Sequence, residues 1–424
     1  MKLASLIAFP LVATLESPIA KGAGAEPFDP AVRAINALGL ELLAKGSQSD
    51  ANALLSPYSI QSALAMTWAG AAGDTQAEMA RVLHYPADEA KLHDALKALR
   101  GALEAVAADT AKRAEASEER GGPSEPIILT MANRLFGQQG YEFRPPFLEF
   151  VEDQYLAPLQ LMDFVRDAQS ARGEINDWVA GQTKQRIRDL IPTDGLDAET
   201  RLVLVNAIYL KAPWQHEFVA AATRPRPFHV NGATAQDVPM MVQKERFGYA
   251  AREGFKVVTL PYTGGDVQLL ILLPDEVDGL AALEAKVTPE LLVTEARPKQ
   301  AEVILQLPKF KLEPPLFRLG QTLRSMGMKS AFDVPRGSAN FDRLAPRKPD
   351  DYLFVSEVFH RTFLELDEKG TEAAAATAVV MARATAMIEK AKPIEVRVDR
   401  PFLFAIQHRP SGACLFLGRV TDPR

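Results

Sequence analysis

The chain has 424 residues, which is long for a single hydrophobic core and by itself favours two or three domains. Its composition, 47% hydrophobic and 24% charged, is that of an ordinary soluble globular protein. A net charge of −6 gives no reason to expect a nucleic acid or an anionic membrane as a partner. The single cysteine, Cys414, excludes an intramolecular disulfide, and its apolar neighbours predict a buried, inert thiol.

The first 25 residues resemble a secretory signal peptide. Lys2 precedes a mostly apolar stretch from Leu3 to Leu15, and Ala23-Gly24-Ala25 matches the small-residue pattern of a cleavage site. We therefore expect residues 1–25 to be a signal peptide and the protein to be secreted or periplasmic. The alternative is a disordered N-terminal tail. No later stretch has the roughly 20 uncharged apolar residues that a membrane-spanning helix needs.

The first half of the chain has mainly helical periodicity. Apolar residues follow one helical face between Pro30 and Leu43. Ser56 and Pro57 then provide an N-cap and a first-turn proline for a second helix. Strand patterns dominate the second half: Arg201 to Leu210, Phe255 to Pro261, Val267 to Leu273, Ala301 to Leu307, Leu353 to Leu366, Ile394 to Val398, Pro401 to Gln407 and Cys414 to Arg419. Helices followed by antiparallel-looking strands predict an α+β fold.

Residue patterns typical of enzymes are missing from the sequence. It has no G-x-S-x-G elbow, no H-E-x-x-H zinc motif, no cysteine pair and no Gly-rich phosphate loop after a strand. The six histidines are scattered, and none has metal-ligand spacing to another. We therefore expect neither an enzyme nor a metal or cofactor site.

A series of short motifs resembles those of the serpin family, in the family order. The motifs are Asn52-Ala-Leu-Leu-Ser-Pro-Tyr-Ser-Ile60, Ala69-Gly-Ala-Ala-Gly-Asp-Thr75, Ala132-Asn-Arg-Leu-Phe136, Ile175-Asn-Asp-Trp-Val179, Leu204-Val-Asn-Ala-Ile-Tyr-Leu-Lys-Ala-Pro-Trp214, Leu260-Pro-Tyr262, Ile271-Leu-Leu-Pro-Asp275, Leu307-Pro-Lys-Phe-Lys311, Val358-Phe-His360, Asp399-Arg-Pro-Phe-Leu-Phe404 and Phe416-Leu-Gly-Arg-Val420. The resemblance covers nearly everything from Ala31 to Arg424. It implies one metastable, monomeric serpin domain over residues 26–424, with three β-sheets, about nine helices and an exposed reactive-centre loop at about 368–394. This expectation replaces the length-based estimate of several domains.

Residues Glu368 to Thr377 read Glu-Lys-Gly-Thr-Glu-Ala-Ala-Ala-Ala-Thr. The alanines alone would suggest a short surface helix. The resemblance implies instead that a serine protease attacks this loop as a substrate and forms an acyl-enzyme. The cleaved loop then inserts into the main sheet as a new strand and traps the protease. We therefore expect an irreversible suicide-substrate inhibitor of serine proteases.

The hinge of this loop consists of Glu368, Gly370, Thr371, Glu372, Ala373, Ala374, Ala375, Ala376 and Thr377. Gly370 supplies backbone freedom at the pivot. Under the two-residue repeat of a strand, Thr371 and Ala373 lie on the face that enters the core, together with Ala375 and Thr377. Glu372 is expected on the other face, where water can solvate it. Because the inserting face carries no proline, charge or bulk, we expect an inhibitory member; the alternative is a non-inhibitory carrier or chaperone.

The family spacing places the scissile bond about seventeen residues from the hinge glutamate, which gives Ala384-Thr385. An elastase-like or subtilisin-like protease, which prefers small residues, would then be the target. A trypsin-like enzyme would prefer the Arg383-Ala384 bond. Met381, Met387 and Lys390 are further alternatives.

The resemblance also points to two clusters in the main sheet. Ser56, Ser59, Asn206 and His360 match the shutter, where the sheet must part. Trp214 and Lys211 match the breach, where insertion begins. For His360 by itself, a satisfied core histidine is the simpler reading, and the expected role is structural gating.

Two expectations concern partners and origin. Residues 91–120, which match the polyanion-binding helix of cofactor-activated relatives, mix Lys and Arg with Asp and Glu, so we expect no polyanion activator. The high alanine content with one cysteine suits a bacterial secreted protein.

Overall fold

The structure is a computed structural model that describes residues 28–46, 51–119, 125–232, 234–349, 351–372 and 392–424. The described residues form nine α-helices: α1 (Asp29–Gly46), α2 (Pro57–Ala69), α3 (Gly73–Val82), α4 (Glu89–Glu118), α5 (Pro145–Tyr155), α6 (Phe164–Gln182), α7 (Leu280–Glu284), α8 (Pro289–Thr294) and α9 (Gly320–Ser325). Two short 3-10 helices are η1 (Ala220–Ala222) and η2 (Ser330–Phe332).

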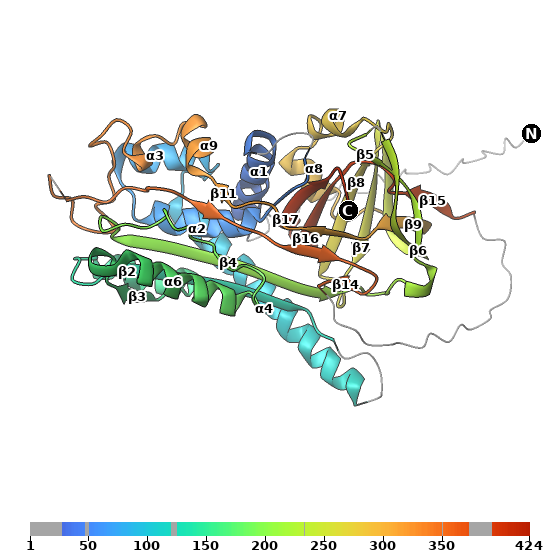
Figure 1. The fold of residues 1–424 in the computed structure, drawn as a ribbon, viewed down its shortest axis with the longest axis horizontal. Coiled ribbons are helices and arrows are strands. Elements are labelled where there is room, and N and C mark those ends of the chain that lie inside the picture. Colours follow the sequence, from blue (N-terminus) through green and yellow to red (C-terminus); the bar gives the residue numbers. More distant parts are fainter. Residues whose placement is uncertain (1–27, 47–50, 120–124, 233, 350, 373–391) are drawn as a thin grey trace, which may run out of the picture.

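The largest sheet has nine strands and forms one end of the molecule (Figure 1). Its order is β1 (Ala53–Leu55), β17 (Ala413–Val420), β16 (Phe402–His408), β8 (Val267–Pro274), β7 (Phe255–Pro261), β6 (Thr234–Arg252), β9 (Gln300–Pro308) and β15 (Ile394–Arg397), with β5 (Arg224–Val230) paired to β6. Every residue of β8, β16 and β17 is buried, which explains their nearly continuous apolar sequences. Helices α1 and α2 pack against β17.

A six-stranded sheet carries the hinge. Its order is β10 (Phe310–Leu312), β13 (Leu364–Leu366), β14 (Gly370–Thr371), β4 (Leu202–Pro213), β2 (Ile128–Gln138) and β3 (Leu159–Met162). A separate pair is formed by β11 (Phe317–Arg318) and β12 (Phe359–His360). Helix α6 covers one face of β2 and β4, while α2 packs on β4 and contributes to the main core, so β4 is covered on both faces.

Helix α2 begins as its sequence predicts. The Ser56 side chain accepts a hydrogen bond from Ser59 N at 3.2 Å, and Pro57 occupies the first turn. This cap fixes both serines at the start of the helix, directly below β4.

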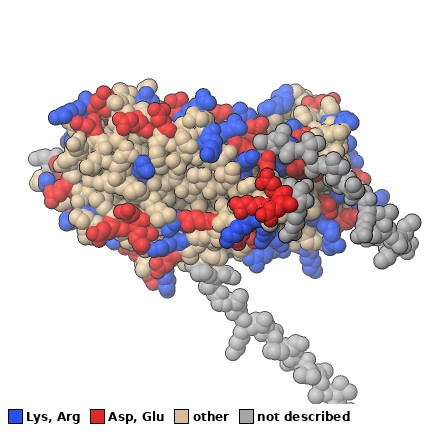
Figure 2. Space-filling model, turned by 90° about the horizontal axis from the view of Figure 1, so that it is seen from below, with Lys and Arg blue, Asp and Glu red and all other residues tan. Residues whose placement is uncertain are grey.

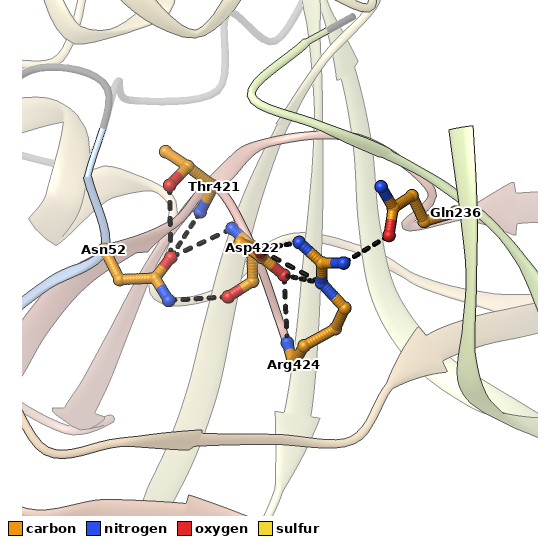
Figure 3. A network of polar contacts seen from close by, with 5 residues as sticks. All are labelled: Asn52, Gln236, Thr421, Asp422 and Arg424. Carbon is orange, nitrogen blue, oxygen red and sulfur yellow. Dashed lines mark hydrogen bonds and ion pairs between the residues drawn. The ribbon is translucent and has the colours of Figure 1, made fainter. Parts of the chain in front are cut away.

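The C-terminus is tied to the start of β1 by Asn52 (Figure 3). The Asn52 side-chain oxygen accepts from Thr421 N at 2.7 Å and from Asp422 N at 3.0 Å, and its amide nitrogen donates to Asp422 O. Arg424 pairs with Asp422 at 2.6 Å and donates to Gln236 on β6. The end of the chain is therefore part of the core structure.

The expected α+β architecture with three sheets in one domain is confirmed. One expected strand differs: Leu353 to Leu366 forms only β12 and β13. Residues 353–358 have strand-like sequence, but the neighbouring edge of β4 does not pair with them. Among the helices of the described residues, none is both long and apolar enough to cross a bilayer.

Candidate functional site

A gap runs along one edge of β4 in the six-stranded sheet, and we call it the seam. One side is β4 and the other is residues 352–366, which contain β12 and β13. Within the described ranges, no strand ladder joins β4 directly to β12 or β13. We call the end at Pro213 the hinge end and the end at Leu202 the far end.

At the hinge end, β14 fills the seam (Figure 1). Gly370 pairs with Pro213, and Thr371 pairs with Ala212 on one side and with Leu366 on the other. Two hinge residues of the intact chain are therefore already strand residues of the sheet.

Only glycine fits at the pivot. Gly370 has φ +151°. A Cβ at this position would collide with the carbonyl oxygen of Ala212 and lie 2.8 Å from Pro213 Cα. The close approach of β14 to β4 therefore depends on the missing side chain as well as on the backbone freedom that the sequence suggested.

Thr371 is fully buried, as expected for the inserting face. Its hydroxyl lies 2.6 Å from that of Tyr262, at hydrogen-bonding distance. The Tyr262 ring stacks on Trp214 with centroids 4.5 Å apart, and burial raises the pKa of Tyr262 well above its ordinary value. Trp214 Nε1 donates to Asp367 O at 2.9 Å, so this predicted breach residue holds the turn before β14.

Glu368 anchors the other side of the same turn. Its carboxylate accepts from Thr223 Oγ1 at 2.7 Å and pairs with Lys309 Nζ at 2.7 Å. Burial alone would raise the pKa of Glu368, but the hydrogen bonds from Lys309 and Thr223 outweigh it and hold the pKa below its ordinary value. Lys211, the second predicted breach residue, instead pairs with Glu125 at 3.0 Å on the β2 side of β4.

The prediction that water solvates Glu372 is wrong. Its side chain is 3% exposed, and its carboxylate pairs with Arg186. Burial raises the pKa of Glu372, and its interactions with Tyr209 and Arg186 only partly offset that effect. The face that strand alternation gives to Glu372 is not open to water in the intact chain, where Arg186, from the segment 183–201 between α6 and β4, contacts its carboxylate.

At the far end, the seam opens into a cavity of about 390 Å³. Its walls are the first residues of β4, the segment 352–360, residues 190–197 and the α2 side chains from Ser59 to Thr67. Phe354, which lines it, is 49% exposed, an unusual state for a large aromatic residue. The far end is therefore a partly apolar slot beside an unpaired strand edge.

Three of the predicted shutter residues, Ser59, Asn206 and His360, line this cavity, and Ser56 and His360 hold α2 to β12. Ser56 N donates to His360 Nε2 at 3.0 Å, and Ser56 Oγ donates to Leu415 O at 2.6 Å. Nε2 can accept only in a neutral imidazole. Burial lowers the pKa of His360 to about 4, which keeps the ring neutral near pH 7.

The other two shutter residues connect α2 to β4. Ser59 Oγ donates to Asn206 Oδ1, and Asn206 Nδ2 donates to Asn133 Oδ1 on β2. Asn133 Nδ2 in turn donates to Tyr155 O at 2.9 Å. The structure thus brings together all four predicted residues, although their role in gating stays a prediction.

Several residues of this site were missed by sequence reasoning. Lys309, Asn133 and Tyr262 stand in motifs that carry the family resemblance, so a closer reading of those motifs could have selected them. Thr223 and Arg186 have no such signal. Their roles arise from contacts between segments that are distant in the chain.

Part of the predicted loop lies outside the described residues. This applies to the hinge positions Ala373, Ala374, Ala375, Ala376 and Thr377, and to the bond candidates Arg383, Ala384 and Thr385. It also applies to residues 1–25. Among the residues that are described, no group of His, Cys, Asp and Glu could hold a metal ion.

Comparison with known proteins identifies relatives over nearly the whole chain. Residues 33–423 match the family model described as Serpin (serine protease inhibitor). The leukocyte elastase inhibitor of Bos taurus is 38% identical over 381 residues, which are 88% of this chain and 93% of that protein. Its Homo sapiens counterpart is 36% identical over 396 residues, which are 91% of this chain and 97% of that protein. The solved structure of cleaved Serpin 42Da is 30% identical, with a TM-score of 0.76 and coverage of 94% of this chain and 100% of that one.

These relatives also correct one expectation. The predicted secreted or periplasmic location is wrong, because the leukocyte elastase inhibitors that match the chain are intracellular serpins without a signal peptide. A bacterial origin stays a prediction from composition. The family model spans most of the sequence, and it describes inhibitors of proteases and not enzymes. The chain belongs to the serpin family.

Proposed function

We propose that the protein is a suicide-substrate inhibitor of elastase-like or subtilisin-like serine proteases. One observation carries the proposal: the hinge is already hydrogen-bonded into the sheet at one end of a seam that is open at the other. A strand that continues from β14 has an unpaired edge of β4 to follow. Its backbone groups would find hydrogen-bond partners on β4 that no strand of the described residues uses.

The register of such a strand follows from β14. Thr371 lies opposite Ala212 in an antiparallel ladder, so each step along the loop moves one residue back along β4. Continued in this register, the pairs are Ala373 with Leu210, Ala375 with Ile208, Thr377 with Asn206 and Met381 with Leu202. The tenth residue after Thr371 therefore reaches the far end of the seam.

The same register explains why the loop has alanines on both faces. Ile208 and Leu210 point into the main core and are buried. Val205 and Ala207 face α6 and are buried in its cluster. An inserted strand would be covered on both sides, so large side chains would clash at every position and not only at alternate ones.

The chemistry is an interrupted proteolysis. The serine Oγ of the protease adds to the carbonyl carbon of Ala384, the bond to Thr385 N breaks, and the serine proton leaves with the Thr385 amine. The ester that remains joins the protease to the loop. Insertion that outruns attack by water on this ester carries the bound protease along the sheet and leaves it trapped. The intact chain must be metastable for this to occur, so its persistence is kinetic.

The target class rests on the loop and on the relatives. Ala384 suits a protease with a small specificity pocket, and the matched relatives are named leukocyte elastase inhibitors. Arg383 leaves a trypsin-like target as the alternative. No activating polyanion is proposed, because several cationic side chains of α4 form ion pairs: Lys97 with Asp153, Arg100 with Glu104 and Lys112 with Asp109. Figure 2 shows basic and acidic side chains interspersed on one face of the molecule.

The test is incubation with elastase-, subtilisin- and trypsin-type proteases, followed by denaturing electrophoresis and mass spectrometry. We expect a covalent complex with the first or second enzyme and a released peptide that begins at Thr385. A peptide that begins at Ala384 would reassign the target to the trypsin-like class. Complete cleavage without a complex for all three enzymes would contradict inhibition and favour the non-inhibitory carrier or chaperone.

A further inference from the structure

Arg186 bridges the two sides of the seam beside the hinge. It lies in the segment 183–201 that crosses the sheet between α6 and β4. Its guanidinium pairs with the buried Glu372 carboxylate. The same guanidinium lies 4.8 Å from the ring centroid of Phe363, immediately before β13. One side chain therefore contacts the hinge and the β13 side of the seam.

Glu372 is the first residue after β14. It has φ +54°, the left-handed conformation, which is uncommon for a residue with a side chain. Its N–H donates to Glu365 O at 3.0 Å. A strand that continued along β4 would require the extended conformation at this position. Glu372 must therefore rotate before the next residue can pair.

The Arg186 contact opposes that rotation. The Glu372 side chain is 3% exposed, so its carboxylate has little water to replace a lost cation. Moving the carboxylate away from Arg186 would leave it buried without its charge partner, which is costly. Glu372 therefore has both the left-handed conformation that ends the strand and the contact with Arg186 that maintains this conformation.

We propose that Arg186 is a positioning residue that arrests the intact loop at Glu372, so that insertion stops after Thr371 until a protease cuts the chain. The inference rests on the proposed function, since the arrested process is the loop insertion of an inhibitor. It assigns to the segment 183–201 a role that the family motifs in the sequence did not indicate. The arrest keeps the rest of the loop available to a protease.

The prediction is that loss of the pair speeds insertion without cleavage. Arg186→Gln should lose complex-forming activity on incubation at physiological temperature about tenfold faster than the wild type, because the buried Glu372 carboxylate loses its charge partner. Arg186→Lys, which keeps the charge without the guanidinium fork, should lie between the two. Arg188→Gln is the matched control: Arg188 lies on the same segment, is exposed, and its guanidinium donates to Gln185 O.

Glu372→Gln removes the same pair from the other side and should show the same acceleration. The Arg186→Gln/Glu372→Gln double variant should be no faster than either single variant. Insertion itself is followed by hydrogen exchange of β4, whose free-edge amides become protected when a strand pairs with them. The proposal is overturned if Arg186→Gln and Glu372→Gln both keep the wild-type half-life, or if they lose activity without new protection on β4.

The hydrogen-exchange measurement separates this inference from the proposed function. A wild type that forms no complex with any protease would defeat inhibition, yet the variants could still gain protection on β4 at different rates. Conversely, if the wild type forms the complex normally and all variants insert at the same rate, the role of Arg186 is contradicted and the proposed inhibition is not.

Discussion

The two ends of the seam differ in how they are filled. At the hinge end, Gly370 pairs with β4, and the fully buried Thr371 pairs with both β4 and β13. At the far end, β4 and the segment 352–360 enclose a cavity of about 390 Å³. The sheet is complete where insertion would begin and incomplete where it would finish.

The two ends of the seam therefore have different roles in the sheet. The hinge end sets register and determines whether the next residue can enter. The far end holds an unpaired strand edge and an unfilled cavity, both of which cost free energy in the intact chain. Changes at the inserting residue Thr371 should therefore affect the outcome of inhibition, whereas changes at the far end should affect stability.

The largest effect is expected from Thr371→Arg at the hinge end. Thr371 is already fully buried in the intact chain, so an arginine at this position should leave the sheet, and insertion would then have to bury an unpaired guanidinium at a cost of several kcal/mol. The loop would insert too slowly to trap the acyl-enzyme, and the fraction of protease found in the covalent complex should fall by more than about tenfold. Denaturing electrophoresis after incubation with an elastase measures that fraction.

Thr371→Val is the matched control. It keeps the branched shape and removes only the hydroxyl that faces Tyr262 at 2.6 Å. The loss of one hydrogen bond is worth about 1 kcal/mol, so this variant should still form the complex. Complex formation by Thr371→Arg at the level of the wild type would show that the hinge need not enter the core.

The second effect is a pH dependence that arises at the far end. Burial lowers the pKa of His360 from its ordinary 6.5 to about 4, so the unfolded chain binds this proton more tightly than the folded chain does. The stabilisation is complete above pH 6.5 and is lost as the pH falls through 4. Its full size is about 3 kcal/mol, because each pH unit between the two pKa values is worth about 1.4 kcal/mol.

Unfolding by urea at several pH values between 7 and 4 measures this effect. His360→Gln removes the titrating group and should lose less stability over this range than the wild type. His216→Gln, at an exposed position, is the control and should follow the wild-type profile. If His360→Gln loses as much stability between pH 7 and 4 as the wild type does, other groups cause the acid sensitivity. His93 and His408 are candidates, because burial also lowers the pKa of each to about 4.

The smallest effect is expected from Glu368→Gln at the hinge end. Glu368 pairs with Lys309, which is 37% exposed, so solvent screens the pair and its loss should cost only about 1 kcal/mol. The hydrogen bonds that lower the pKa of Glu368 stabilise the fold above its ordinary pKa near 4.5, and this contribution is lost as the pH falls below it. In thermal unfolding, Glu368→Gln should therefore be less stable than the wild type at pH 7, and the two should be equally stable near pH 3. Equal differences at both values would contradict a charge effect.

Much of the site was predictable because its residues stand in dense local motifs. Ser56 was placed by its helix-capping pattern, and the burial of Thr371 followed from strand alternation. The same alternation failed for Glu372, because a two-residue repeat says which face a side chain takes but not what covers that face. Arg186, which pairs with Glu372, lies in the segment 183–201, and no local pattern links the two.

The continuous strand expected from Leu353 to Leu366 failed for a related reason. Apolar alternation reports burial, and it is the same whether or not the neighbouring edge is paired. The open seam is a property of how β4 and the segment 352–366 lie in space. Sequence alone therefore indicated a sheet that could accept a strand, but not which part of it stands open in the intact chain.

Hydrogen exchange of β4 before and after cleavage of the loop tests this account most directly. In an antiparallel ladder, alternate residues of β4 face the seam, so about half of the amides between Leu202 and Ala212 should exchange rapidly in the intact protein. The amides that face β2 should be protected throughout. After cleavage by an elastase we predict that the seam-facing amides become protected along the whole of β4. Unchanged exchange in the cleaved protein would contradict insertion of the loop into the seam.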